Sequence, residues 1–153
     1  MSLPPISAAE LEQYLHEHIP LSRAMQVSVL EVGAMSVTLA APLAPNINHR
    51  HTVFGGSAAS VATLAAWSVL HRALCQEGLD TRVVIQKSSM DYEKPIAGDF
   101  VAAATIDDQE SWGRFLRAVA RRGRGRIRLN AELAYGGERV GTLQGDFVAF
   151  KVD

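Results

Sequence analysis

The chain has 153 residues, 48% of them hydrophobic and 20% charged, which is the composition of one globular domain with its own core. With 15 basic and 16 acidic residues the net charge is −1, which excludes a general attraction to nucleic acid or to an anionic membrane. The single cysteine, Cys75, excludes an intrachain disulfide, and residues 1–10 lack the pattern of a signal peptide. We therefore expect a cytoplasmic protein.

The first half of the chain predicts a helix, two strands and a long helix. Ser7 and Glu10 form a capping-box pattern at the start of the first helix. Alternating apolar residues predict the strands, and a run of small residues predicts the long helix, which polar residues interrupt too often for a membrane span. The expected elements are a helix from Ser7 that ends at Pro20, strands over 27–32 and 36–41, and a helix over 57–76 that stops at Gly78.

The second half predicts four strands and one short helix. Apolar residues at helical spacing, beginning at Trp112, indicate the helix. Residues 126–135 alternate strictly between polar and apolar, as in a strand with one solvated face, and Gly136-Gly137 predicts a hairpin turn. The expected elements are strands over 82–93 and 99–107, a helix over 110–121, and strands over 126–135 and 139–152.

This order of elements favours an α+β fold with an antiparallel sheet, formed by a single domain over residues 1–153. One sheet can bury a long apolar helix only if it curves around that helix. The pattern permits such a curved sheet without requiring it.

Two adjacent glycines, Gly55 and Gly56, stand where the long helix is expected to begin. The first N–H groups of a helix have no intrahelical partner and lie at the positive end of the helix dipole. Glycine lets a ligand oxygen approach them without a Cβ in the way, which suits the stabilisation of negative charge on an acyl oxygen. The alternative is a tight turn with Ser57 as a helix N-cap.

The segment Asn-Ile-Asn-His-Arg-His-Thr-Val-Phe-Gly-Gly-Ser at 46–57 resembles the Asn-x-x-Gly-x-x-His-Gly-Gly motif of hotdog-fold acyl-CoA thioesterases. Asn48 and both glycines match, whereas His51 replaces a glycine and Phe54 replaces the histidine. A second segment, Met-Asp-Tyr-Glu-Lys-Pro-Ile-Ala-Gly-Asp at 90–99, resembles the family's Asp-[Tyr/Phe]-x-x-Pro-x-x-x-Gly-Asp strand signature.

The two motifs and the helix between them cover residues 46–99. The spellings Thr-x-Phe-Gly-Gly-Ser and Leu-Ala-Ala-Trp are most similar to the thioesterase domains that also occur C-terminal to acetyltransferase domains. The resemblance implies a hotdog fold, in which a curved antiparallel sheet wraps a long central helix, and hydrolysis of an acyl thioester.

One position departs from the family. Its enzymes usually have an Asp or Glu on the central helix seven residues after the second glycine, where this chain has Thr63. A hydroxyl cannot replace a carboxylate as a general base at neutral pH. The base must therefore come from another residue, or the domain binds acyl thioesters without hydrolysing them.

The residues expected at the site follow from the two motifs. Gly55 and Gly56 would polarise the carbonyl, and Asn48 would position the carbonyl or the attacking water. Asp91, whose motif position could face the site across a dimer, is the first choice of base, followed by a loop histidine. Asn48 alone would equally suit an Asx-turn, and Asp91 an exposed strand. The residues expected to contact substrate are His51, Phe54, Ser57, Tyr92, Arg124 and Arg126, the two arginines coming from a basic cluster suited to phosphates.

No metal site is expected, because the histidines lie on distant segments. We expect no cofactor other than coenzyme A as part of the substrate, no nucleic-acid or membrane partner, and a homodimer or a dimer of dimers. The alternatives to an acyl-CoA or acyl-carrier-protein thioesterase are a non-catalytic acyl-binding domain and a dehydratase-like hotdog enzyme.

Overall fold

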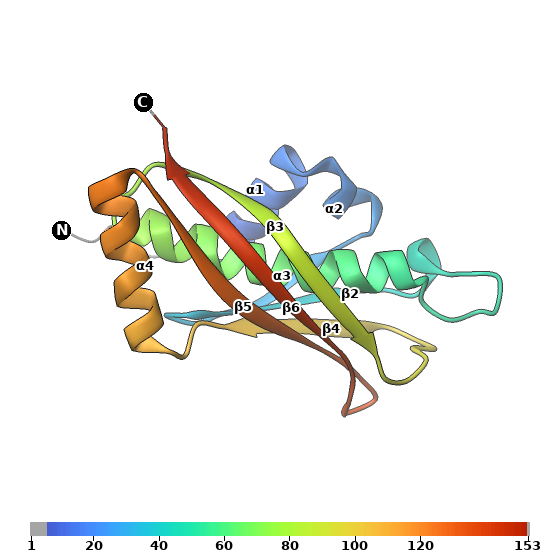
Figure 1. Cartoon of the computed structure of the whole chain (residues 1–153). Helices are drawn as coiled ribbons and strands as arrows, with labels where there is room; N and C mark the ends of the chain where they lie inside the picture. Colours follow the sequence, from blue (N-terminus) through green and yellow to red (C-terminus); the bar gives the residue numbers. More distant parts are fainter. Residues whose placement is uncertain (1–5, 153) are drawn as a thin grey trace.

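The computed structural model, which describes residues 6–152, shows a six-stranded antiparallel sheet curved around one long helix (Figure 1). The strand order is β1-β2-β4-β5-β6-β3. The α+β hotdog architecture expected from the sequence is therefore confirmed. The elements are α1 Ala8–His18, α2 Pro20–Ala24, β1 Ser28–Val32, β2 Ser36–Ala41, a 3₁₀ turn Ala44–Asn46, α3 Gly55–Gln76, β3 Thr81–Tyr92, β4 Phe100–Thr105, α4 Gln109–Arg122, β5 Arg124–Tyr135 and β6 Glu138–Lys151.

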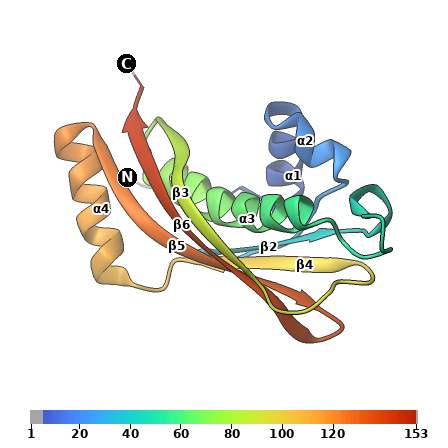
Figure 2. The ribbon, with the colours of Figure 1, turned by 45° about the vertical axis from the view of Figure 1, so that its right-hand side comes forward.

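Helix α3 lies in the concave face of the sheet and forms the centre of the core (Figures 1 and 2). Its Ala, Val and Leu residues pack against apolar side chains from the sheet, among them Leu39, Phe100 and Phe147, which are at most 1% exposed. By length and composition α3 could cross a membrane, but 67% of its most apolar window is buried in the protein. It is a core helix.

The helix ends follow local capping chemistry. At the start of α1, Glu10 N donates to Ser7 Oγ and Ser7 N donates to Glu10 Oε1, both at 3.1 Å, which is the predicted capping box. Pro20 ends this first helical segment as expected, but it also begins the short helix α2, because the fixed φ of proline suits a first helical position. Gly78 follows α3 with a φ of +77°, as a C′ glycine should.

Helix α3 begins two residues earlier than predicted. Phe54 is the N-cap residue, and Gly55, Gly56 and Ser57 form the first turn. Ser57 is therefore not an N-cap, and no side chain caps this helix.

The two edges of the sheet are unlike each other. At β1, side chains of α1 bind the backbone just before and within the strand: Val29 N donates to Glu12 Oε1 at 2.8 Å, and the His16 ring donates to Val27 O at 2.7 Å. Strand β3 is 12 residues long and, among the residues that the structure describes, pairs only with β6. Most of its side chains are exposed, including Val84 and Ile85. The β3 edge is therefore a long, open pairing edge.

Candidate functional site

The two sequence motifs meet in space at the start of α3. Val53 N donates to Ile96 O at 2.8 Å, which joins the loop before α3 to the segment after β3. The hydroxyl of Tyr92 donates to Gly55 O at 3.1 Å. Residues from 46–57 and 90–99 thus form one structure, as the resemblance implied.

Three backbone N–H groups are free at this point. Within residues 6–152, the first α3 amide with a backbone acceptor is that of Ala58, which donates to Phe54 O at 3.0 Å. The N–H groups of Gly55, Gly56 and Ser57 have no hydrogen-bond partner among the described residues. These three hydrogen-bond donors lie next to one another at the positive end of the dipole of a 22-residue helix. Such a position favours the binding of a negatively charged oxygen.

Two aromatic rings flank the glycines, and the Phe54 ring occupies the space in which a side chain on Gly56 would begin. A Cβ on Gly56 would lie 2.5 Å from Phe54 Cε2, and a Cβ on Gly55 would lie 3.4 Å from Tyr92 Cε1. Phe54 and Tyr92 are each 58% exposed. The glycines therefore allow the rings to lie against the helix start, and the rings provide apolar surface beside the free N–H groups.

Asn48 organises the loop that leads to the glycines. Its Oδ1 accepts from Arg50 N at 2.8 Å and from Thr52 N at 3.1 Å, and its Nδ2 donates to Thr52 Oγ1 at 2.9 Å. These bonds are those of an Asx-turn. They occupy the atoms with which Asn48 would hold a substrate, so the structure favours a structural role in the loop. His51 lies at the tip of this loop with a φ of +64° and an exposed side chain.

The structure does not bring Asp91 to the glycines. Successive side chains of a strand point to opposite faces, and Tyr92 takes the face of α3. Asp91 lies on the outer, convex face beside Glu132 and Thr142. Within one protomer Asp91 therefore does not face the helix start, and its role as a base across a dimer stays a prediction.

The two predicted phosphate-binding arginines are also on the outer face. Leu133 of β5 and Tyr92 of β3 both pair with Gly141 of β6, so Leu133 marks the end of the sheet that lies near the glycines. Arg124 is nine residues from Leu133 along β5, which places Arg124 ~30 Å from that end. Arg126 and Arg128 bind the buried carboxylate of Asp146 at 3.2 and 2.7 Å. The Arg128 hydrogen bond holds the pKa of Asp146 below its usual range, although burial opposes this.

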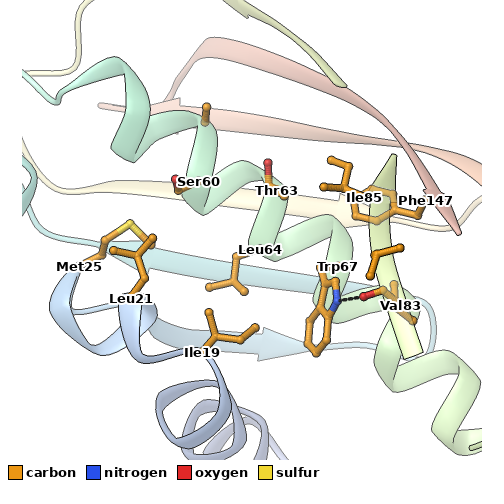
Figure 3. Close-up of a pocket in the computed structure, with 12 residues that line it drawn as sticks. Ile19, Leu21, Met25, Ser60, Thr63, Leu64, Trp67, Val83, Ile85 and Phe147 are labelled. Atoms are coloured by element: carbon orange, nitrogen blue, oxygen red, sulfur yellow. Dashed lines mark hydrogen bonds between the residues drawn. The ribbon is translucent and has the colours of Figure 1, made fainter. Parts of the chain in front are cut away.

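An apolar pocket that the sequence did not predict runs beside α3, between α2 and β3, with a volume of about 500 Å³ (Figure 3). Distant segments contribute to it, so no local pattern could have identified it. Its lining residues are Ile19, Leu21, Met25, Ala59, Ser60, Thr63, Leu64, Trp67, Val83, Val84, Ile85 and Phe147.

Trp67 belongs to a row of stacked aromatic side chains from α1 and α3. The His71 ring is 4.7 Å from both the Trp67 and Tyr14 rings, and the Tyr14 ring is 4.3 Å from that of His18. Burial, and then the neighbouring His18, lower the pKa of His71. Burial, and then Asp80, raise the pKa of Cys75, which disfavours the nucleophilic thiolate, and the sulfur lies 3.7 Å from His71 Nε2.

Among residues 6–152, no three His, Cys, Asp or Glu side chains are grouped so that they could hold a metal ion.

A model of the family described as "Putative thioesterase (yiiD_Cterm)" matches residues 8–151 of the chain. The chain belongs to this family. The resemblance expected from the two motifs is confirmed, including the subgroup. The matched residues include the helix start, the apolar pocket and the open β3 edge.

Solved structures agree with this assignment. A protein of unknown function from Chlorobaculum tepidum is 26% identical, with a TM-score of 0.90, over 95% of this chain and 94% of its own. A structure from Shewanella oneidensis, named a putative thioesterase, is 26% identical, with a TM-score of 0.83, over 94% and 96%. A probable thioesterase from Pseudomonas aeruginosa, at 20% identity and a TM-score of 0.76, covers 99% of each chain and shows the fold alone.

Proposed function

We propose that this protein hydrolyses an acyl thioester whose thiol is coenzyme A or the pantetheine arm of a carrier protein. The observation on which this rests is the set of three free N–H groups at Gly55, Gly56 and Ser57, with glycines at the two leading positions. The thioester carbonyl oxygen would accept hydrogen bonds from these groups. The family assignment supports the same class of reaction.

In the proposed reaction, water attacks the carbonyl carbon and the carbonyl oxygen becomes an oxyanion held by the N–H groups. Collapse of this intermediate breaks the carbon–sulfur bond and releases a carboxylate and a thiol. Donors placed at the developing charge typically contribute roughly 3–4 kcal/mol to transition-state stabilisation.

The general base is proposed to come from the loop before α3. Thr63 cannot serve, and α3 contains no carboxylate. Asp91 lies on the other face of the sheet. His49 and His51 are exposed on the loop that leads to the glycines, and an imidazole can accept a proton near neutral pH. His49→Gln and His51→Gln are compared, and the variant that lacks the base is expected to lower kcat by roughly 10²-fold while the other keeps its activity.

We further propose that the protein is a homodimer paired through β3. A long edge with exposed Val84 and Ile85 invites a second strand, whereas α1 side chains protect β1. If two β3 strands pair antiparallel, the two sheets join into one continuous sheet, and a two-fold axis perpendicular to that sheet relates the protomers. Both α3 helices then lie on the same face of the joined sheet. Light scattering that shows a monomer at micromolar concentration would overturn this.

Such a dimer does not bring the arginines to the thioester carbonyl. If the strands pair near the middle of β3, the end of one sheet that bears Arg124 and Arg126 lies level with the helix start of the other, but the arginines stay on the outer face and both α3 helices on the inner face. Replacing Arg124 with Gln should therefore leave KM for acyl-CoA unchanged, and a raised KM would show that the phosphates of coenzyme A reach the outer face.

The function is tested by incubating the protein with acyl-CoAs of graded length and measuring the released thiol. Thioester hydrolysis above the uncatalysed rate supports the proposal. The second candidate, an acyl-binding domain without activity, is favoured by the absence of a carboxylate on α3, and binding without thiol release would establish it. A dehydratase role is disfavoured, because none of the residues lining the apolar pocket is a histidine or an acid.

A further inference from the structure

The apolar pocket beside α3 has three walls of different origin. Leu21 and Met25 come from the region of α2, Trp67 from α3, and Val83 from β3, and their side chains point toward one space (Figure 3). None of the twelve lining residues is charged, and Ser60 and Thr63 supply the only hydroxyl groups. A pocket of this volume with an apolar lining suits an uncharged hydrocarbon ligand.

The pocket begins close to the proposed oxyanion site. Ala59 and Ser60 are three and four residues beyond Gly56, so they lie one turn away on the same face of α3. Trp67 is eleven residues beyond Gly56, which places it ~16 Å along the helix. A chain whose carbonyl lies at the helix start can therefore extend along α3 as far as Trp67.

Trp67 closes the far end as a rigid wall. Its Nε1 donates to Val83 O at 2.9 Å, which ties the indole to β3. The ring also stacks on His71 at 4.7 Å with an interplanar angle of 10°. Rotation of the indole out of this position would break both the hydrogen bond and the ring stack.

We propose that this pocket binds the acyl tail of the substrate, a linear saturated chain of about eight to twelve carbons, and that Trp67 sets the upper limit of its length. At ~1.3 Å of advance per carbon along a zigzag of ~1.5 Å bonds, ~16 Å accommodates about twelve carbons. At roughly 30 Å³ per methylene-sized group, 500 Å³ also exceeds what such a chain requires. The inference rests on the proposed function only in placing the thioester carbonyl at the helix start.

Binding is measured first, without reference to turnover. Decanoate and decanoyl-CoA are titrated into the protein while tryptophan fluorescence is recorded, with hexanoate and hexadecanoate for comparison. Affinity is expected to rise with length by up to roughly fourfold per methylene and to level off near twelve carbons. The signal should disappear in Trp67→Phe, since Trp112 belongs to α4 and does not line the pocket.

Length selection is then measured with pocket variants. Thr63→Leu fills the middle of the pocket and is expected to lower kcat/KM for decanoyl-CoA at least tenfold relative to hexanoyl-CoA. Thr105→Leu, at an exposed position on β4, is the matched control and should leave the ratio unchanged. Trp67→Phe should extend the preference by one or two carbons, which loss of folding alone would not do.

The outcomes separate the two proposals. Length-dependent binding without thiol release keeps the pocket assignment and overturns hydrolysis. Thiol release at equal kcat/KM for acetyl-CoA and decanoyl-CoA, with no fluorescence response, keeps hydrolysis and overturns the pocket assignment. A Thr63→Leu protein with altered dimerisation and unaltered chain-length preference would show that a second copy of the chain fills the pocket, which also overturns the assignment.

Discussion

Gly56→Val tests the proposed role of the start of α3. The added Cβ would lie 2.5 Å from Phe54 Cε2, so the Phe54 ring must rotate away. The two methyl groups beyond that Cβ would then occupy space through which a carbonyl oxygen has to approach the free N–H groups. The N–H groups themselves remain, so the variant blocks access without removing the donors.

The expected loss of activity is large and the expected loss of stability is small. Denying the transition state an oxyanion donor costs roughly 3–4 kcal/mol, or 10²–10³ in kcat. Valine is more favourable than glycine in a helix by about 0.3–0.5 kcal/mol, which offsets part of the cost of moving the exposed Phe54 ring. The denaturation midpoint should therefore stay close to that of the wild type.

The assay is thiol release from decanoyl-CoA, measured together with the urea midpoint of each protein. Gly113→Val is the matched control, because Gly113 lies in α4 and its added Cβ would meet only the flexible end of Arg117 at 3.3 Å. The control should keep wild-type activity. A folded Gly56→Val protein with kcat within threefold of the wild type would refute the oxyanion site.

Three further outcomes follow from the geometry. Asp91→Asn should change kcat by less than twofold, because this carboxylate lies on the outer face, and a 10²-fold loss would restore it as the base. Tyr92→Phe removes the hydrogen bond to Gly55 O, and kcat should fall by roughly three- to tenfold, the value of one ordinary hydrogen bond; an unchanged rate would remove Tyr92 from the site. The pKa of Asp146 is lowered mainly by Arg128, so its contribution to stability is present above the ordinary carboxylate pKa and is lost as the pH falls through the lowered folded value. Urea midpoints from pH 7 to 3 should therefore fall more for the wild type than for Asp146→Asn, and parallel curves would contradict this.

The helices and strands were predictable because their signals are local. The strand over 126–135 and helix α4 each bury one face, and the spacing of their apolar residues shows this directly in the sequence. The start of α3 was placed two residues late, because glycine is a poor helix former and its presence in the first turn contradicts local propensity. Here the surrounding loop and sheet fix the helix start.

The side of the sheet occupied by Asp91 could not be predicted for a related reason. Strand β3 is an edge strand exposed on most of its length, so its sequence lacks the alternation that would mark an inner face. The sequence places Asp91 and Tyr92 on opposite faces of the strand but does not say which of them accompanies α3. The hydrogen bond from Tyr92 to Gly55 decides it.

The motif around the glycines was predictable, whereas the pocket beside it was not. Leu21 and Trp67 are 46 positions apart in the sequence and meet only because α2 and β3 both border α3. The roles of the two histidines in the loop depend on a bound substrate, which no sequence pattern supplies.

The most direct test of the account is a crystal structure with a decanoyl-CoA analogue in which a methylene group separates the carbonyl carbon from sulfur, so that water cannot cleave it. The account predicts that the carbonyl oxygen lies about 2.7–3.1 Å from at least one of the N–H nitrogens of Gly55, Gly56 and Ser57, with the acyl chain directed along α3 toward Trp67. A carbonyl oxygen bound elsewhere, with those N–H groups facing solvent, would contradict the central claim.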